Sequence, residues 1–373
     1  MPGDIITVTK PSLPELDDLQ PLLRQIWDSG RLTNGGSLHQ ELESRLCEYL
    51  GVEHLSLFAN GTLALVTALQ ALGVTGEVIT TPYTFVATSH ALIWNKLKPV
   101  FVDIEPDSFN MDPMGIEAVI SDKTTAILPV HCYGTPANVA EIQAIADKHD
   151  LRVIYDAAHA FGVNYDGSSL LDAGDVSVLS FHATKVFNTF EGGALVCRDA
   201  ETKRRVDYLK NFGFADEVTV VAPGINGKMN EFQAAVGLLQ LDRIDDVIAE
   251  RQRLYRRYAD ALARVPGVDL MPEPGNTKWN YAYCPVLVRA EFPISRDALY
   301  KRFREANILV RRYFYPLVTD FPIYHEARRL AMPNARKAAD QILCLPLYPD
   351  LSCDEFDRII AVIQGALSAE ERE

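Results

Sequence analysis

Short apolar runs alternate with segments of helical periodicity along the first half of the chain. The runs that predict strands are HLSLF (54–58), EVIT (77–80), KPVFVDI (98–104), TTAILPV (124–130), LRVIYDA (151–157), DVSVLSF (175–181) and GALVCR (193–198). Between them, segments such as GTLALVTALQAL (61–72) and ANVAEIQAIADKH (137–149) repeat apolar residues at helical spacing. Buried strands that alternate with amphipathic helices predict an α/β fold with a mostly parallel seven-stranded sheet flanked by helices.

The second half of the chain carries a different set of elements. They are a long helical pattern (230–264), a turn-rich linker (266–276), a strand (279–288), a helix with Ser295 as N-cap (295–308) and a final helix (353–373). We expect the first of these to be one continuous helix that leads into a second domain. The predicted organisation is a large α/β domain over residues 1–250, including a proline-rich N-terminal arm, and a smaller C-terminal α/β domain over residues 251–373.

Composition and charge narrow the choice of partners. The chain has 373 residues, of which 48% are hydrophobic and 23% charged, as in ordinary globular proteins. Its 36 basic and 50 acidic residues give a formal net charge of -14, which disfavours nucleic acid or an anionic membrane as a partner.

The six cysteines are scattered, without a CxxC pair or metal-ligand spacing, and predict free thiols and no metal site. With no signal peptide or membrane-length apolar run, we expect a cytoplasmic protein.

Polar or aromatic residues follow four of the predicted strands. The stretches are NGT (60–62), TPYTF (81–85), DAAHA (156–160) and SFHATK (180–185). Ligands of parallel sheets bind at the carboxyl ends of the strands, so these residues predict a site at one edge of the sheet.

Each of these residues has a structural and a functional interpretation. Free N–H groups after Gly61, with the hydroxyls of Thr62 and Ser180, would suit a phosphate, although an ordinary N-cap would look the same. Asp156 ends a buried strand and needs a partner, which would be a protonated ring nitrogen, a helix end or an ion pair. The stacking of Phe85 on a flat ligand competes with core packing.

The same choice applies to Tyr83 as a stacking residue and to His159, which would contact the ligand or fill the core. Taken by itself, Lys185 is expected to be a solvated loop residue, since an ammonium is costly to bury unless it is paired or chemically used. Taken together, an amine, a phosphate cradle, a strand-end aspartate and an aromatic platform are what pyridoxal 5'-phosphate (PLP) requires, with pyridoxamine 5'-phosphate as its aminated form.

The chain resembles the DegT-type sugar aminotransferases, which are PLP enzymes of fold type I, the aspartate aminotransferase fold. The resemblance spans essentially the whole chain. It rests on NGTLAL, TPYTFVAT, FVDI, PVHCYG, YDAAHAFG, SFHATK with EGGALV, and GINGKMNEFQAAVGLLQL. The combination is highly specific, although each piece alone is weak.

The resemblance implies roles for matching residues. Lys185 would bond to the cofactor and move the proton, and Asp156 would pair with its pyridine nitrogen. Phe85 would stack on the ring, while His159 would also contact the cofactor. The phosphate would be held by Gly61, Thr62 and Ser180, and by Asn226 of the other subunit, which implies a homodimer with shared active sites.

Substrate contacts follow from the same resemblance and from the departures from it. The candidates are Thr33, Asn34, Tyr83, His182, Lys228, Arg311, Tyr313 and Tyr315, with Arg31, Arg311 and Arg312 as candidates for the diphosphate of a sugar nucleotide. Asn60 stands where serine is common, His159 where glutamine is common, and Lys228 where arginine is usual. The segment RRYFYPLVTDFPIY (311–324) lacks the histidine that commonly follows the tyrosine-proline stretch, a difference that concerns substrate choice.

The most similar branch of the family acts on dTDP-linked keto-6-deoxy sugars. It implies transfer of an amino group from L-glutamate to a dTDP-4-keto-6-deoxyhexose, giving dTDP-4-amino-4,6-dideoxyglucose and 2-oxoglutarate. The 3-keto isomer remains an alternative substrate, and the product could enter a lipopolysaccharide O-antigen, a glycoprotein or a secreted metabolite.

Lys185 disfavours two other classes of protein, a PLP-dependent dehydratase with histidine in place of the lysine and a non-catalytic relative. A doubly wound oxidoreductase is disfavoured because NGTLAL is not GxGxxG.

Overall fold

A seven-stranded sheet lies at the centre of the larger part of the computed structural model, which describes residues 4–324, 326–327 and 330–367. In spatial order its strands are β2 (Leu55–Phe58), β10 (Gly193–Cys197), β9 (Val176–Ser180), β6 (Arg152–Asp156), β5 (Thr124–Leu128), β3 (Glu77–Thr80) and β4 (Lys98–Phe101). All neighbours pair in parallel except β10, which is antiparallel to both β2 and β9. The predicted seven-stranded, mostly parallel sheet is confirmed.

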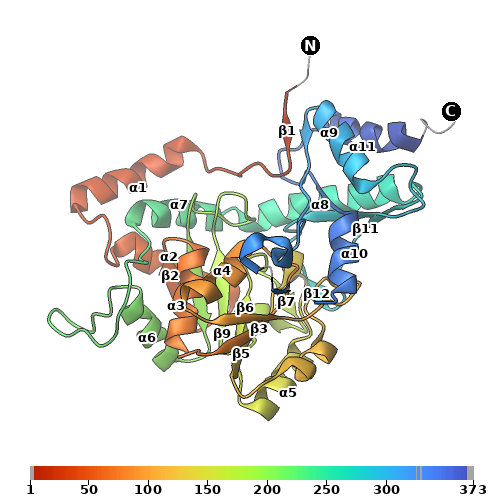
Figure 1. Ribbon diagram of the computed structural model, residues 1–373. Helices are drawn as coiled ribbons and strands as arrows, with labels where there is room; N and C mark the ends of the chain where they lie inside the picture. The colour runs from red at the N-terminus through yellow and green to blue at the C-terminus, as the bar shows by residue number, and fades with distance from the viewer. Residues whose placement is uncertain (1–3, 325, 328–329, 368–373) are drawn as a thin grey trace.

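Helices cover both faces of this sheet (Figure 1). One face packs against α3 (Gly61–Ala71), α4 (Val86–Trp94) and α6 (Ala200–Leu209), and the other against α2 (Ser37–Leu50), α5 (Val139–His149) and α7 (Glu231–Leu241). Successive side chains of a strand point to opposite faces. Val178 and Leu179 of β9 accordingly belong to different hydrophobic clusters, which explains why these strands are apolar at nearly every position.

The C-terminal part contains a second, smaller sheet. Its strands are β11 (Val268–Leu270), β13 (Cys284–Val288) and β15 (Ile342–Leu345), accompanied by α8 (Ile244–Leu262), α9 (Arg296–Glu305), α10 (Pro333–Gln341) and α11 (Cys353–Leu367). The N-terminal helix α1 spans Leu16–Ser29. The short elements are a sheet of β12 (Thr277–Lys278), β7 (Asn164–Tyr165) and β8 (Ser168–Ser169), and 3₁₀ turns at Pro113–Gly115, Glu117–Val119, Cys132–Gly134, Leu170–Asp172, Val318–Asp320 and Pro322–Tyr324. The last six residues of the predicted final helix lie outside the described part.

The expectation of one continuous helix over residues 230–264 is wrong. The chain breaks between α7 and α8, where Arg243 has φ -115° and ψ -2° instead of helical values. The side chains at the break are bonded to other elements: Arg45 pairs with Asp242, and Arg243 donates to the carbonyl of Leu13 at 2.6 Å. These tertiary contacts accompany the break, although the helical periodicity of the sequence runs on through it.

The N-terminal arm lies against the C-terminal part. Its strand β1 (Ile6–Thr7) pairs in parallel with β14 (Ile308–Leu309), and Figure 1 shows it beside α9 and α11. Further along the arm, the carbonyl of Ser12 accepts a hydrogen bond from Gln240 of α7. The arm therefore connects both parts of the molecule, while the predicted boundary at residue 250, inside α8, stays a prediction.

Two further features concern the cysteines and the helices. All six cysteines are free; Cys132, Cys197, Cys284 and Cys344 are buried, whereas Cys353 is exposed. Among the described residues, none of the helices has the length and apolar character needed to cross a membrane.

Candidate active site

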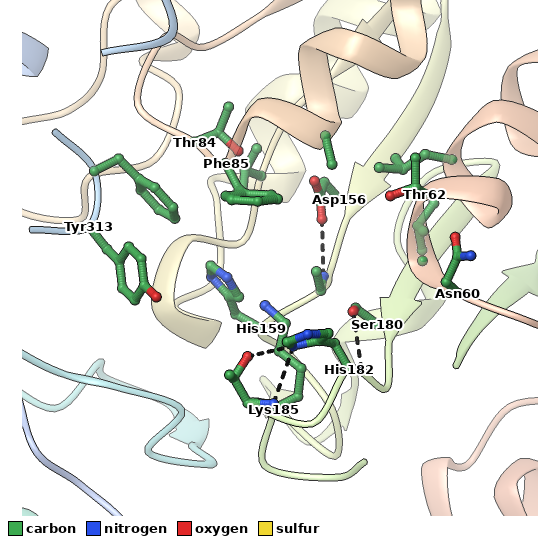
Figure 2. A pocket seen from close by; sticks show the side chains of 18 of the residues that line it. Asn60, Thr62, Thr84, Phe85, Asp156, His159, Ser180, His182, Lys185 and Tyr313 are labelled. Carbon is green, nitrogen blue, oxygen red and sulfur yellow. Dashed lines mark hydrogen bonds between the residues drawn. The ribbon is translucent and has the colours of Figure 1, made fainter. Parts of the chain in front are cut away.

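A cavity of about 410 Å³ opens at the carboxyl edge of the large sheet (Figure 2). The ends of β2, β3, β6 and β9 all contribute to its wall, so the four polar stretches lie together as expected. The wall is completed by Tyr283, Arg311, Tyr313 and Phe314 from the C-terminal part of the chain. Residues from the first half of the chain and residues from its C-terminal part therefore line the same cavity.

The start of α3 forms one end of the cavity. Asn60 is the N-cap, and its side-chain oxygen accepts a hydrogen bond from the N–H of Leu63 at 2.9 Å. A Cβ on Gly61 would lie 3.0 Å from the Cβ of Ser180, so glycine allows α3 to approach β9 closely. The hydroxyls of Thr62 and Ser180 thus line the cavity beside helix N–H groups, an arrangement suited to an anion.

Asp156 ends β6 and is only 5% exposed. Its Oδ2 accepts a hydrogen bond from Thr88 at 2.7 Å and its Oδ1 accepts one from the N–H of Ala158 at 3.1 Å. Thr88 gives its only proton to this carboxylate, so at 2.8 Å it accepts from Thr84. Burial raises the pKa of Asp156, while these hydrogen bonds and the charge of Lys185 act in the opposite direction.

Lys185 lies on the loop that follows β9. Burial lowers its pKa to about 8, against an opposing contribution from the charge of Asp156. Its Nζ donates a hydrogen bond to the hydroxyl of Tyr283 at 3.4 Å. A substantial fraction of this amine is therefore neutral, with its lone pair available, in mildly alkaline solution.

His159 is buried beside Lys185. Its Nδ1 accepts a hydrogen bond from the N–H of Tyr133 at 3.1 Å, so in the neutral ring the proton is on Nε2. Burial, and secondarily the charge of Lys185, lower the pKa of His159 well below its usual value. The ring is a neutral donor at the cavity wall.

Phe85 differs from the other large apolar residues of the site because its side chain is 58% exposed. It is the N-cap of α4, and Figure 2 shows its ring projecting into the cavity. Its position suits a flat ligand, against which the ring would be buried.

Three of the predicted substrate residues line the cavity: His182, Arg311 and Tyr313. The predicted residues outside the cavity wall are Arg31, Thr33, Asn34, Tyr83, Asn226, Lys228, Arg312 and Tyr315.

Several residues outside the wall have partners of their own. Tyr83 is completely buried, and the ring of Tyr315 lies 4.7 Å from the guanidinium of Arg312. Lys228 donates to Asn211 at 2.6 Å. Direct substrate contact is therefore not supported for Tyr83 within this chain.

The residues to which the sequence interpretation gave no role include Thr84, Thr88, Tyr283 and Phe314. Thr88 had a weak signal, since it lies one helical turn after Thr84 in TPYTFVAT. Tyr283 had none, because its contact with Lys185 joins positions 98 residues apart.

The family assignment follows from comparison with known proteins. The profile of the DegT/DnrJ/EryC1/StrS aminotransferase family matches residues 15–364. The chain belongs to this family. Among curated relatives of this aminotransferase, the dTDP-4-amino-4,6-dideoxy-D-glucose transaminase of Escherichia coli is 52% identical over 366 residues, covering 97% of this chain and 99% of the relative.

Solved structures agree with this assignment. DesI, crystallised in the presence of its TDP-sugar product, superposes with a TM-score of 0.94 at 35% identity, covering 100% of this chain and 97% of DesI. NtdA from Bacillus subtilis, with bound cofactor PMP, gives a TM-score of 0.85 at 28% identity, covering 95% and 82%. The predicted fold type I, the aminotransferase activity and the PLP cofactor are confirmed.

The residues of this aminotransferase fit PLP. One cavity is lined by four kinds of group. They are an amine that can lose its proton, a buried carboxylate with free lone pairs, an exposed aromatic ring, and a helix N-terminus with two hydroxyls. The described residues contain no cluster of three or more metal-ligating side chains.

We expect Thr88→Val to weaken PLP binding by about tenfold, since a hydrogen bond to a charged group contributes about 1.5–3 kcal/mol. Without it, the pKa of Asp156 rises further and its carboxylate pairs less well with a pyridinium. Absorbance titration of the cofactor-free protein with PLP measures the change. The control is Thr67→Val, because Thr67 is a buried helical threonine whose hydroxyl has no hydrogen-bond partner in the described part of the chain. Equal affinities for both variants would contradict the role of Thr88.

Proposed function

We propose that this enzyme transfers the amino group of L-glutamate to C4 of a dTDP-4-keto-6-deoxyhexose. The products are dTDP-4-amino-4,6-dideoxyglucose and 2-oxoglutarate. The observation that carries the proposal is the 52% identity, over nearly the full chain, to the E. coli transaminase named for that amino sugar. The half-buried Lys185 and the buried Asp156 in one cavity support it, because both groups are needed for amino transfer.

The cofactor supplies an aldehyde carbon and an electron-accepting ring when it is bound. Lys185 would hold its aldehyde end, Asp156 would stabilise the protonated pyridine nitrogen, and Phe85 would cover one ring face. The N–H groups and hydroxyls at the start of α3, with Ser180, would bind the phosphate.

The proton traffic is assigned to Lys185. Its neutral amine would remove the α-proton of glutamate and return a proton during each half of the reaction. Glutamate loses two electrons as it becomes 2-oxoglutarate, and the sugar ketone gains two as it becomes an amine. The exchange balances without another oxidant or reductant. His159 would present its Nε2 proton to the same cavity.

The keto sugar is assigned to the side of the cavity formed by Arg311, Tyr313 and Phe314. Arg311 is the cation of this group and suits the diphosphate of a sugar nucleotide, which a guanidinium binds in bidentate fashion. His182 lines the cavity near the loop of Lys185. The four buried free cysteines are consistent with a reducing compartment, and we propose a cytoplasmic location.

The first test follows both half-reactions in the visible absorption of the purified PLP-loaded protein. L-Glutamate should convert the cofactor to its amino form, and dTDP-4-keto-6-deoxyglucose should restore the original spectrum. Lys185→Ala should reduce both rates by at least about a hundredfold, the effect of losing a general acid–base group. Restoration by the 3-keto isomer alone would favour the 3-aminotransferase alternative, and no response to glutamate would reject the proposed donor.

The second test concerns the pH dependence of PLP capture by the cofactor-free protein. Only the neutral amine reacts, and the pKa of Lys185 is lowered to about 8, so the capture rate should rise up to about pH 8 and then level off. An exposed lysine would continue to gain rate up to about pH 10.4. The charge of Asp156 raises the pKa of Lys185, so Asp156→Asn should move the midpoint to lower pH. A midpoint near that of a free lysine, unmoved by the variant, would contradict the assignment.

We also propose a homodimer in which Asn226 serves the partner's phosphate site. Asn226 is exposed outside the cavity wall of its own chain, and the preceding loop exposes Phe212, Phe214, Val218 and Val220. Sedimentation velocity should give the mass of two 41.5 kDa chains, and Asn226→Ala should weaken PLP retention. A monomer that retains PLP fully would reject this arrangement.

A further inference from the structure

Two buried tyrosine hydroxyls meet at one main-chain carbonyl beside the cavity. Tyr83 follows β3, Tyr133 lies in the 3₁₀ turn Cys132–Gly134, and both are fully buried. Their hydroxyl oxygens are 2.7 Å apart. Both also contact the carbonyl oxygen of Tyr313, that of Tyr83 at 3.1 Å.

The protons of this group can be assigned. Burial raises the pKa of both phenols well above the usual value, so each keeps its single proton. Tyr133 donates to the carbonyl of Tyr313, which can only accept. Tyr83 then shares its proton between the Tyr133 oxygen and the same carbonyl. The group is satisfied only while the main chain at Tyr313 stays in place, because otherwise two buried hydroxyls lose an acceptor.

The main chain around Tyr313 is held from other directions too. Arg311 exchanges two backbone hydrogen bonds, of 3.3 and 2.7 Å, with Cys344 of β15. The ring of Tyr315 is contacted by the guanidinium groups of Arg296 and Arg312, at 4.5 and 4.7 Å.

Asp297 pairs with both of these arginines. The segment is thus fixed at Arg311 and at Tyr315, and the tyrosine pair fixes the carbonyl between them. Arg311, Tyr313 and Phe314, which line the cavity, are carried on this fixed main chain.

We propose that Tyr83 and Tyr133 are positioning residues for the keto-sugar substrate. They hold the carbonyl of Tyr313 so that the side chains of the segment face the cavity at a set depth. This inference rests on the proposed function, because it assigns the segment to the sugar. L-Glutamate is small and reacts next to Lys185, which is carried by the large sheet, whereas a sugar nucleotide extends further along the cavity wall.

The experiment uses the PLP-loaded full-length protein and measures the two half-reactions separately, with L-glutamate and with dTDP-4-keto-6-deoxyglucose. Tyr133→Phe removes the direct donor to the carbonyl and should raise the KM for the sugar about tenfold, the factor that corresponds to about 1.4 kcal/mol. Tyr83→Phe leaves that donor in place and should give a smaller rise. The glutamate half-reaction of both variants should stay within about twofold of the wild type, as expected for residues outside the chemistry.

The matched control is Tyr258→Phe. Tyr258 is also fully buried, and its hydroxyl donates to a main-chain carbonyl, that of Pro346, at 2.9 Å. It should lower the melting temperature like the other two variants, without changing the KM for the sugar. Should Tyr133→Phe fail to fold, Tyr83→Phe carries the same test.

Three results would overturn the inference. They are an unchanged KM for the sugar in Tyr133→Phe and Tyr83→Phe, an equal loss in both half-reactions, or a loss confined to glutamate. Failure of the proposed function would look different, because the wild-type protein itself would then not react with the sugar.

Discussion

The burial of two ionisable groups in one cavity is the constraint on which the site depends. Asp156 is buried and Lys185 is half-buried, which raises the pKa of the acid and lowers that of the amine. The charge of each group offsets only part of the effect of burial on the pKa of the other. Hydrogen bonds from and to neighbouring groups add to this offset. Thr88 and the N–H of Ala158 supply them at Asp156, and the hydroxyl of Tyr283 accepts from Lys185. The result is a carboxylate that is prepared for a cationic partner and an amine that can lose its proton.

Much of this arrangement could be predicted from the sequence. Strands buried on both faces are apolar at nearly every position, so the seven runs were recognisable, and polar residues directly after them had to lie at one edge of the sheet. Gly61, Asp156, Ser180 and Lys185 therefore came together as expected. Their roles toward the cofactor stay predictions.

The rest depended on contacts that no local pattern carries. Tyr283 reaches the cavity from the small sheet, and its neighbours in WNYAYCPVLV give no reason to choose it over the other aromatic residues. The resemblance made Tyr83 a candidate substrate contact, yet Tyr83 is completely buried whereas the neighbouring Phe85 is exposed. At the break between α7 and α8, Arg243 donates a hydrogen bond to Leu13, more than two hundred residues away, a contact that no local pattern announces.

The pairing of β1 with β14 has a consequence for the order in which the molecule is assembled. Residues 6 and 7 are synthesised about three hundred residues before their strand partners, residues 308 and 309. The arm therefore stays unpaired through most of translation, whereas the large sheet can close earlier because its strands all lie before residue 198. The wall that carries Arg311 directly follows β14. The part of the cavity wall that bears Asp156, Ser180 and Lys185 is therefore synthesised well before the part that bears Arg311 and Tyr313.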